Sequence, residues 1–296
     1  MQEEKSEKSP SMDEQPSQVS ATDSAGSSES TEEDFARRAQ QMVDGVIEEV
    51  VEEKEENGKK VRHKGIYLLP NLFTTGALFS GFYAIVAGMN GDFSQAAIAI
   101  FVAMVLDGLD GRVARLTNTQ SAFGAEYDSL ADVVSFGVAP ALVAFSWMLQ
   151  DLGKFGWIAA FVYVAGTALR LARFNVQVGQ ADSKWFTGLP SPSAAAIVAA
   201  LVWVLHGYDM EWMAAKVLVA LVIAGVGLLM VSNVRYYSFK DIDLKSRVPF
   251  FVLLALVLLI AIISIDPAIM LLLVFVGYGL SGPLRAVLRM NKKAEA

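Results

Sequence analysis

Residues 107–132 read DGLDGRVARLTNTQSAFGAEYDSLAD and join two apolar stretches, residues 93–112 and 129–150. The segment contains four aspartates, two arginines and three glycines. Charged side chains are costly inside a hydrocarbon layer, so charges that border two apolar stretches mark a candidate functional site. The apolar stretches around this segment decide the fold.

Beyond Lys64 the chain is built from apolar runs of about 17–25 residues, the length that crosses a hydrocarbon core of ~30 Å as a helix. The whole chain of 296 residues is 54% hydrophobic and 19% charged, outside the averages of soluble proteins. We therefore predict an all-α, polytopic membrane helix bundle. Its eight transmembrane helices are expected at about residues 68–89, 93–112, 129–150, 155–175, 190–206, 213–232, 248–264 and 267–286.

The basic residues set the expected orientation of the bundle. If the N-terminus is cytoplasmic, all but two of the 17 Lys and Arg in residues 61–296 fall in cytoplasmic segments, and only Lys154 and Lys216 fall outside. Cytoplasmic loops of membrane proteins carry an excess of Lys and Arg. Both termini are therefore predicted to be cytoplasmic, with the segment 107–132 at the cytoplasmic face.

Residues 1–60 have a different composition from the rest of the chain. They carry 17 Asp and Glu against 7 Lys and Arg, a balance of −10, whereas residues 61–296 have a balance of +3. The first thirty residues contain almost no large apolar side chains, so burial cannot offset the entropy lost on ordering. We expect a disordered acidic cytoplasmic tail over 1–60 and a membrane domain over 61–296. The tail lacks the pattern of a signal peptide.

The spacing of the aspartates indicates the chemistry. Asp107 and Asp110 are three residues apart and Asp128 and Asp132 are four apart, so each pair projects from one face of a helix. The chain has no Cys and two His, which leaves oxygen as the ligand of any metal. Four carboxylates in one space would repel each other without cations, and oxygen ligands suit Mg²⁺ or Mn²⁺. The competing interpretation is that single aspartates cap helices or face cytoplasmic water.

The spacing D-x2-D-G-x2-A-R-x8-G-x3-D-x3-D, from Asp107 to Asp132, resembles the signature of the CDP-alcohol phosphatidyltransferase family. The resemblance covers roughly residues 65–290. It implies a membrane enzyme that transfers a phosphatidyl group from a CDP-linked lipid to an alcohol and releases CMP, using two divalent ions. It also implies a homodimer in the bacterial inner membrane, with membrane lipid and no nucleic acid as partner.

The resemblance also implies roles for individual residues. Asp107, Asp110 and Asp128 correspond to metal ligands, and Asp132 to a general base with a further metal contact. Positions that contact CDP-diacylglycerol are matched by Asn71, Thr74, Gly111, Arg115 and Ser121. Some of these roles have a competing interpretation. Asn71 and Thr74 could instead cap the helix beside Pro70. Gly111 could serve close helix packing, and Arg115 could reach lipid phosphates at the membrane boundary.

Four flanking motifs resemble the phosphatidylserine synthase branch of this family, which implies L-serine as the acceptor. They are VVSFGVAPA (133–141), RLARFN (170–175), GLPSP (188–192) and MVSNVRYYSFK (230–240). Serine carries a carboxylate that Arg170 and Arg173 could bind, although both could equally anchor the cytoplasmic end of their helix.

Two alternatives stay open. The first is a phosphatidylglycerophosphate synthase or another CDP-alcohol phosphatidyltransferase. With glycerol 3-phosphate as the acceptor, such an enzyme could use the same two arginines, because a phosphate dianion also needs cations. A divalent-cation transporter is the remote alternative, because carboxylates in a helix bundle can line an ion path. Transport predicts acids near the middle of the membrane, whereas the four aspartates are expected together at one face.

Overall fold

The computed structural model describes residues 54–56, 59–61, 68–117, 121–177, 185–208, 212–237 and 264–294, with the single residues 254, 258 and 261. The chain divides into two compact units, Met1–Arg62 and His63–Ala296. In the first unit, strands β1 (Lys54–Glu56) and β2 (Lys59–Val61) pair antiparallel. The sequence predicted no strand here, and the predicted disorder of residues 1–53 lies outside the described residues.

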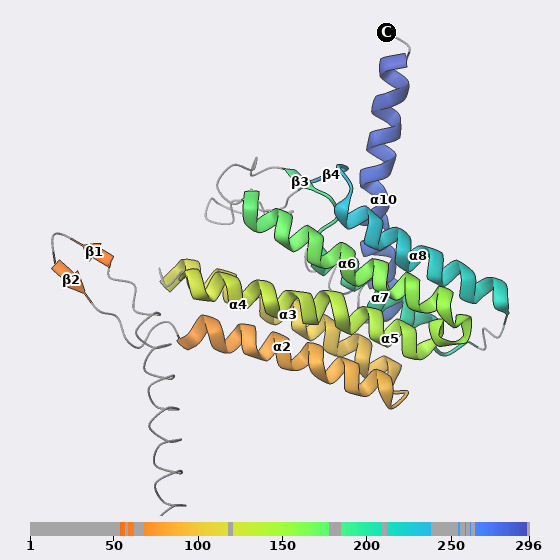
Figure 1. The fold of residues 1–296 in the computed structure, drawn as a ribbon, viewed down its shortest axis with the longest axis horizontal. Helices are drawn as coiled ribbons and strands as arrows, with labels where there is room; N and C mark the ends of the chain where they lie inside the picture. The colour runs from red at the N-terminus through yellow and green to blue at the C-terminus, as the bar shows by residue number, and fades with distance from the viewer. Residues whose placement is uncertain are drawn as a thin grey trace, which may run out of the picture. The chain divides into compact units, whose positions relative to one another are not determined.

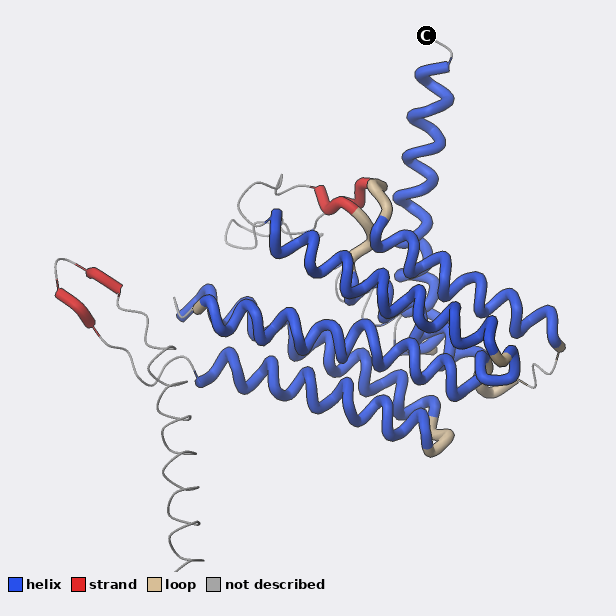
Figure 2. The backbone as a smooth tube through the Cα atoms, viewed as in Figure 1, coloured by secondary structure: helices blue, strands red, loops and turns tan. Residues whose placement is uncertain are grey.

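The second unit is a helix bundle, which confirms the predicted all-α membrane fold. Figures 1 and 2 show long helices lying side by side, with α4, η1 and α5 following one another in a single rod. In chain order the helices are α2 (Leu68–Met89), α3 (Phe93–Thr117), α4 (Ala122–Asp132), the π-helix η1 (Val133–Val138), α5 (Ala139–Trp147), the 3-10 helix η2 (Leu149–Leu152), α6 (Lys154–Gln177), α7 (Ser191–Leu205), α8 (Met213–Val231) and α10 (Pro267–Ala294).

Within the described parts of the chain, five helical segments are long and apolar enough to cross a membrane. They are Pro70–Met89, Phe123–Trp147, Lys154–Val176, Met213–Val231 and Pro267–Leu288. The helix α7 is apolar but has only 15 residues. The predicted span 248–264 lies almost wholly outside the described residues, so the predicted count of eight stays a prediction.

The helix ends differ from the predicted spans at the charged end of the bundle. The bounds of α2 agree with the prediction, but α3 continues past residue 112 to Thr117 and α10 past residue 286 to Ala294. The rod begins at Ala122 instead of residue 129. Hydropathy reports where a helix leaves the apolar layer, whereas the helix itself continues into polar sequence until its backbone is capped.

Side-chain contacts identify the two ends of the bundle. At one end, the Ser94 hydroxyl and His206 Nε2 are 2.9 Å apart, and Lys216 forms an ion pair with Asp151. Asp110 lies at the opposite end of α3 from Ser94. Lys216, one of the two lysines expected on the outer side, therefore lies at the end opposite the aspartates.

A small antiparallel sheet lies at the same end as the C-terminus of α6 (Figure 1). It pairs β3 (Trp185–Thr187) with β4 (Arg235–Tyr237), two segments in which the sequence predicted no strand. Gly188 follows β3 with φ +82, and its N–H donates to the Val234 carbonyl at 2.8 Å. The Tyr236 hydroxyl donates to the Gly279 carbonyl at 2.9 Å, which ties the sheet to α10.

Candidate active site

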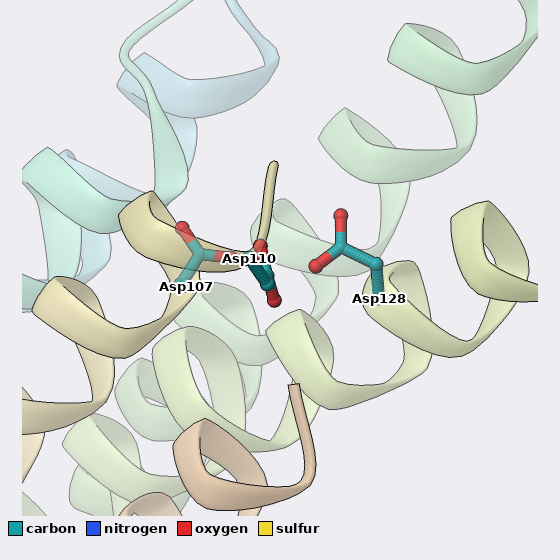
Figure 3. A group of neighbouring side chains, drawn as sticks. All are labelled: Asp107, Asp110 and Asp128. Carbon is teal, nitrogen blue, oxygen red and sulfur yellow. The ribbon is translucent and has the colours of Figure 1, made fainter. Parts of the chain in front are cut away.

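Three carboxylates come together where α3 ends and α4 begins. Asp107 and Asp110 project from α3 and Asp128 projects toward them from α4 (Figure 3). One oxygen of each carboxylate lies within 4.8 Å of the others. Asp110 is 5% exposed and the other two are partly buried. These oxygens are close enough to share a cation.

The start of α4 sets where Asp128 lies. The Ser121 hydroxyl accepts a hydrogen bond from the Gly124 N–H at 2.9 Å, so this serine is the N-cap of α4. A Cβ on Gly124 would lie 3.1 Å from that hydroxyl and 3.5 Å from Asn71 Oδ1. The structure therefore brings Asn71 beside the start of α4, and it gives Ser121, predicted to contact the CDP-linked lipid, a capping role.

Thr74 lies against the carboxylate cluster. It is 4% exposed, and its hydroxyl donates to Asp110 Oδ2 at 2.8 Å, with the Pro70 carbonyl as a second acceptor at 3.2 Å. A hydrogen bond to a carboxylate fixes its orientation. The structure thus assigns Thr74 a supporting contact with a predicted metal ligand.

Gly111 and Arg115 lie on the exposed surface of α3 beyond Asp110. A Cβ at Gly111 would meet no atom within 4 Å, so close helix packing does not explain the glycine. Arg115 is in the last turn of α3, where a cation stabilises the helix dipole. Both residues remain open to an approaching ligand.

Asp132 adjoins the three-carboxylate cluster at the end of α4. Its carboxyl interacts with those of Asp107 and Asp128 and with the guanidinium of Arg170. Four carboxylates and one guanidinium leave an excess of negative charge in a poorly solvated space, where like charges repel strongly. The geometry therefore favours a bound cation.

One oxygen of Asp128 tests whether a metal fits. Asp128 Oδ1 is buried and has no hydrogen-bond partner among the residues that the structure describes. A buried carboxylate oxygen without a partner is unfavourable, and a divalent cation supplies one. Aspartate oxygens are the ligands that Mg²⁺ and Mn²⁺ prefer, so the residues present fit such an ion.

The two arginines predicted to bind serine have different partners. Arg170 Nη1 donates to the Ser191 hydroxyl at 2.7 Å, and its buried Nε has no partner within the described chain. Arg173 donates to the Val231 carbonyl at 3.2 Å and to Asn233 Oδ1 at 2.6 Å. Arg170 also interacts electrostatically with Asp132, whereas Arg173 joins α6 to the end of α8.

Several hydrogen-bond partners of the arginines and of α4 were not predicted from the sequence. Ser191, Asn233 and Asn175 lie in motifs noted for their resemblance, yet no role was predicted for any of them. Asn175 Nδ2 donates to the Ser129 hydroxyl at 3.0 Å, which links α6 to the turn that carries Asp128. The motifs had marked these residues in the sequence, but the residue that each of them contacts lies in another helix, so the contacts were not predictable.

The chain is similar in sequence to known proteins. The family model described as CDP-alcohol phosphatidyltransferase matches residues 67–231. Three relatives carry the name CDP-diacylglycerol–serine O-phosphatidyltransferase. The Helicobacter pylori protein is 41% identical over 192 residues, covering 64% of this chain and 81% of the relative. The Methanocaldococcus jannaschii protein is 36% identical over 182 residues, covering 61% and 80%. The Saccharomyces cerevisiae protein is 45% identical over 139 residues, covering 42% and 50%. Since the family model spans more than half of the chain, the protein belongs to the CDP-alcohol phosphatidyltransferase family.

Proposed function

We propose that this protein transfers the phosphatidyl group of CDP-diacylglycerol to the hydroxyl of L-serine, giving phosphatidylserine and CMP. The observation that carries the proposal is the cluster of Asp107, Asp110 and Asp128, with a buried oxygen that lacks a partner among the described residues. Such a cluster suits a reaction on a diphosphate, whose negative charge must be offset before a nucleophile can approach.

Serine as the acceptor is supported by the names of the relatives from bacteria, archaea and yeast. It is also supported by Arg170, whose guanidinium lies near Asp132 and keeps one buried N–H without a partner in the described chain. A guanidinium binds a carboxylate strongly and in a fixed orientation. Arg170 would hold the serine carboxylate so that its hydroxyl faces Asp132.

Asp107, Asp110 and Asp128 would hold divalent cations, Mg²⁺ or Mn²⁺, and we propose two of them with Asp132 as a further ligand. Bound there, such ions would polarise the phosphoryl oxygens and offset their negative charge. The Thr74 hydroxyl would keep Asp110 oriented toward the cluster. The exposed Arg115 would contact the diphosphate from the cytoplasmic side.

The chain's own residues then carry out the transfer. Asp132 accepts the proton of the serine hydroxyl as a general base. The serine oxygen forms a bond with the phosphorus that carries the diacylglycerol, and the bond from that phosphorus to the bridging oxygen breaks. The electron pair leaves on CMP. Asp132 lies in the first half of the membrane-crossing segment Phe123–Trp147, toward the charged end of the bundle, so the acyl chains can stay in lipid while CMP leaves into water.

We further propose that the site faces the cytoplasm in a bacterial inner membrane and that the protein is a homodimer. The charge bias of residues 61–296 supports the orientation. Relatives named as transferases give no support to the alternative of a cation transporter. Chemical crosslinking in native membranes tests the homodimer.

A parallel acceptor assay tests the proposed function. Membranes that contain the full chain receive CDP-diacylglycerol, Mn²⁺ or Mg²⁺ and labelled serine, glycerol 3-phosphate or inositol in separate reactions. We expect label in lipid with serine only, together with an equal amount of CMP. Failure to incorporate serine refutes this acceptor, and incorporation of glycerol 3-phosphate instead identifies the alternative synthase.

A variant of the proposed base completes the test. Asp132→Asn should still bind CDP-diacylglycerol but lose roughly 10²- to 10⁴-fold in turnover, the usual contribution of a general base. Full activity in this variant would remove the assignment of Asp132.

A further inference from the structure

The motif VVSFGVAPA folds as a π-helix directly after Asp132. The helix η1 covers Val133–Val138, and the Ala139 N–H donates to the Val134 carbonyl, five residues back. π-turns are rare and occur frequently at functional sites. The proposed chemistry leaves this motif without a role.

A buried tyrosine supports the π-turn. Pro140 has no N–H and cannot donate to the Phe136 carbonyl, four residues earlier. The Tyr163 hydroxyl on α6 donates to that carbonyl instead, at 2.9 Å, and Tyr163 is 0% exposed. In a membrane-crossing segment no bulk water can replace this donor. Tyr163 therefore stabilises the irregular turn.

The opposite face of η1 is held by α2. The Ser135 hydroxyl donates to the Ala77 carbonyl at 3.1 Å. Gly81 packs so closely that a Cβ there would lie 2.7 Å from Ser135 Cα. The π-helix is thus held between α2 and α6 by one hydroxyl hydrogen bond on each side, from Ser135 to α2 and from Tyr163 of α6.

The register of η1 sets the direction of the aspartates that precede it. Each residue of an α-helix turns the chain by about 100°, so a change of η1 from the π-helical to the α-helical register, a shift of one residue, would rotate α4 relative to α5 by about that angle. The helix α5 is fixed because Val143 and Ala144 are buried in the core. The rotation would therefore fall on α4 and carry Asp128 and Asp132 away from α3.

We propose that Tyr163 and Ser135 are positioning residues, whose hydroxyls hold η1 in its π-helical register and thereby keep Asp128 and Asp132 directed at the aspartates of α3. Neither side chain needs to touch substrate. The inference rests on the proposed phosphatidyl transfer for its kinetic test, and on metal binding for a test that does not depend on the acceptor.

The kinetic test compares Tyr163→Phe with Tyr236→Phe. Both tyrosines are 0% exposed and donate to a backbone carbonyl at 2.9 Å, but Tyr236 bonds Gly279 on α10. Small displacements of reacting groups cost up to roughly 100-fold in rate. We expect Tyr163→Phe to lower kcat by about 10- to 100-fold with KM values for both substrates within about twofold, and Tyr236→Phe to keep kcat within about twofold. Equal kcat in the two variants would overturn the inference.

A second pair of variants tests the inference if Tyr163→Phe fails to fold. Ser135→Ala removes the bond to α2, and Ser80→Ala removes a similar bond from the Ser80 hydroxyl to the Ala99 carbonyl at 2.8 Å. Ser135→Ala should lower kcat, whereas Ser80→Ala should only lower the thermal midpoint. An unchanged kcat in Ser135→Ala contradicts the role of this hydroxyl.

Mn²⁺ binding separates this inference from the proposed function. Titration of the full-length protein in detergent, followed by electron paramagnetic resonance, should give a several-fold higher Kd for Mn²⁺ in Tyr163→Phe than in Tyr236→Phe. Loss of a residue that holds a metal ligand typically weakens metal binding by roughly 10- to 100-fold, and Tyr163 acts on the ligands less directly. If the unaltered protein incorporates no serine but this difference persists, the function is wrong and the positioning role stands. Equal Mn²⁺ affinities refute the positioning role even where serine is incorporated.

Discussion

Removing one hydroxyl at Thr74 should weaken the metal site without touching a carboxylate. Thr74→Val keeps the shape of the side chain and deletes the donor that lies 2.8 Å from Asp110 Oδ2. That oxygen is nearer than the Pro70 carbonyl and it is charged, so it is the favoured acceptor. The substitution leaves a largely buried carboxylate free to turn away from Asp107 and Asp128.

The size of the effect follows from the charge on the acceptor. A hydrogen bond to a charged group contributes about 1.5–3 kcal/mol, and about 1.4 kcal/mol corresponds to a factor of ten. Loss of this bond should therefore raise the Mn²⁺ concentration for half-maximal activity by about 10- to 100-fold, within the range found for residues that support metal ligands. The turnover at saturating Mn²⁺ should fall much less.

Two titrations, each made on three proteins, decide this prediction. Activity and the paramagnetic resonance of bound Mn²⁺ are titrated in the unaltered protein, in Thr74→Val and in Ser80→Ala. The control also loses a hydroxyl of α2, but one that donates to the backbone of Ala99. In an Asp110→Asn background the threonine change should add little, because the coupled pair is already broken. Half-saturation in Thr74→Val within about twofold of the unaltered protein would refute the orientation of Asp110 by this hydroxyl.

Three further changes test other parts of the structure. Arg170→Lys should raise KM for serine by about tenfold or more and leave KM for CDP-diacylglycerol unchanged, because an ammonium cannot bind a carboxylate in two places. Arg173→Lys alters a contact with the end of α8 and should mainly lower thermal stability. If Arg173→Lys raises KM for serine and Arg170→Lys does not, Arg173 and not Arg170 binds the serine carboxylate. Gly166→Ala should lower the thermal midpoint, since its Cβ would lie 2.4 Å from the Gly227 carbonyl oxygen and overpacking costs about 1–3 kcal/mol. Gly225→Ala has open space and should leave the midpoint unchanged, so equal losses would contradict the close crossing of α6 and α8. Removing metal with EDTA should abolish activity, which added Mn²⁺ should restore.

The membrane fold was predictable because it depends on local properties of the chain. A helix in lipid satisfies its own backbone, so a run of apolar residues is enough to specify it. The predicted and observed bounds of α2 agree for this reason. The π-helix η1 was not predictable in the same way, because it depends on Pro140 and on a tyrosine from another helix.

The carboxylates of the candidate site were predictable from the sequence, but the residues that hold them in place were not. Asp107 and Asp110 share a helical face by spacing alone, and the short connection to α4 brings Asp128 opposite them. The bond from Thr74 to Asp110 joins residues 36 apart in sequence, and no local pattern identifies it. Ser121 resembled a ligand contact in sequence, and its capping geometry emerged only from the folded chain.

The amino-acid sequence by itself determined that this protein is a membrane helix bundle with a carboxylate motif, because hydropathy and helical periodicity act over a few turns. Only the tertiary structure decided which of the two arginines lies near the aspartates. Arg170 and Arg173 are one turn apart on α6, yet Arg170 donates a hydrogen bond to Ser191 and interacts electrostatically with Asp132, while Arg173 donates to the end of α8. A side chain's partner depends on which neighbouring helix packs against its face, and that is a property of the assembled bundle.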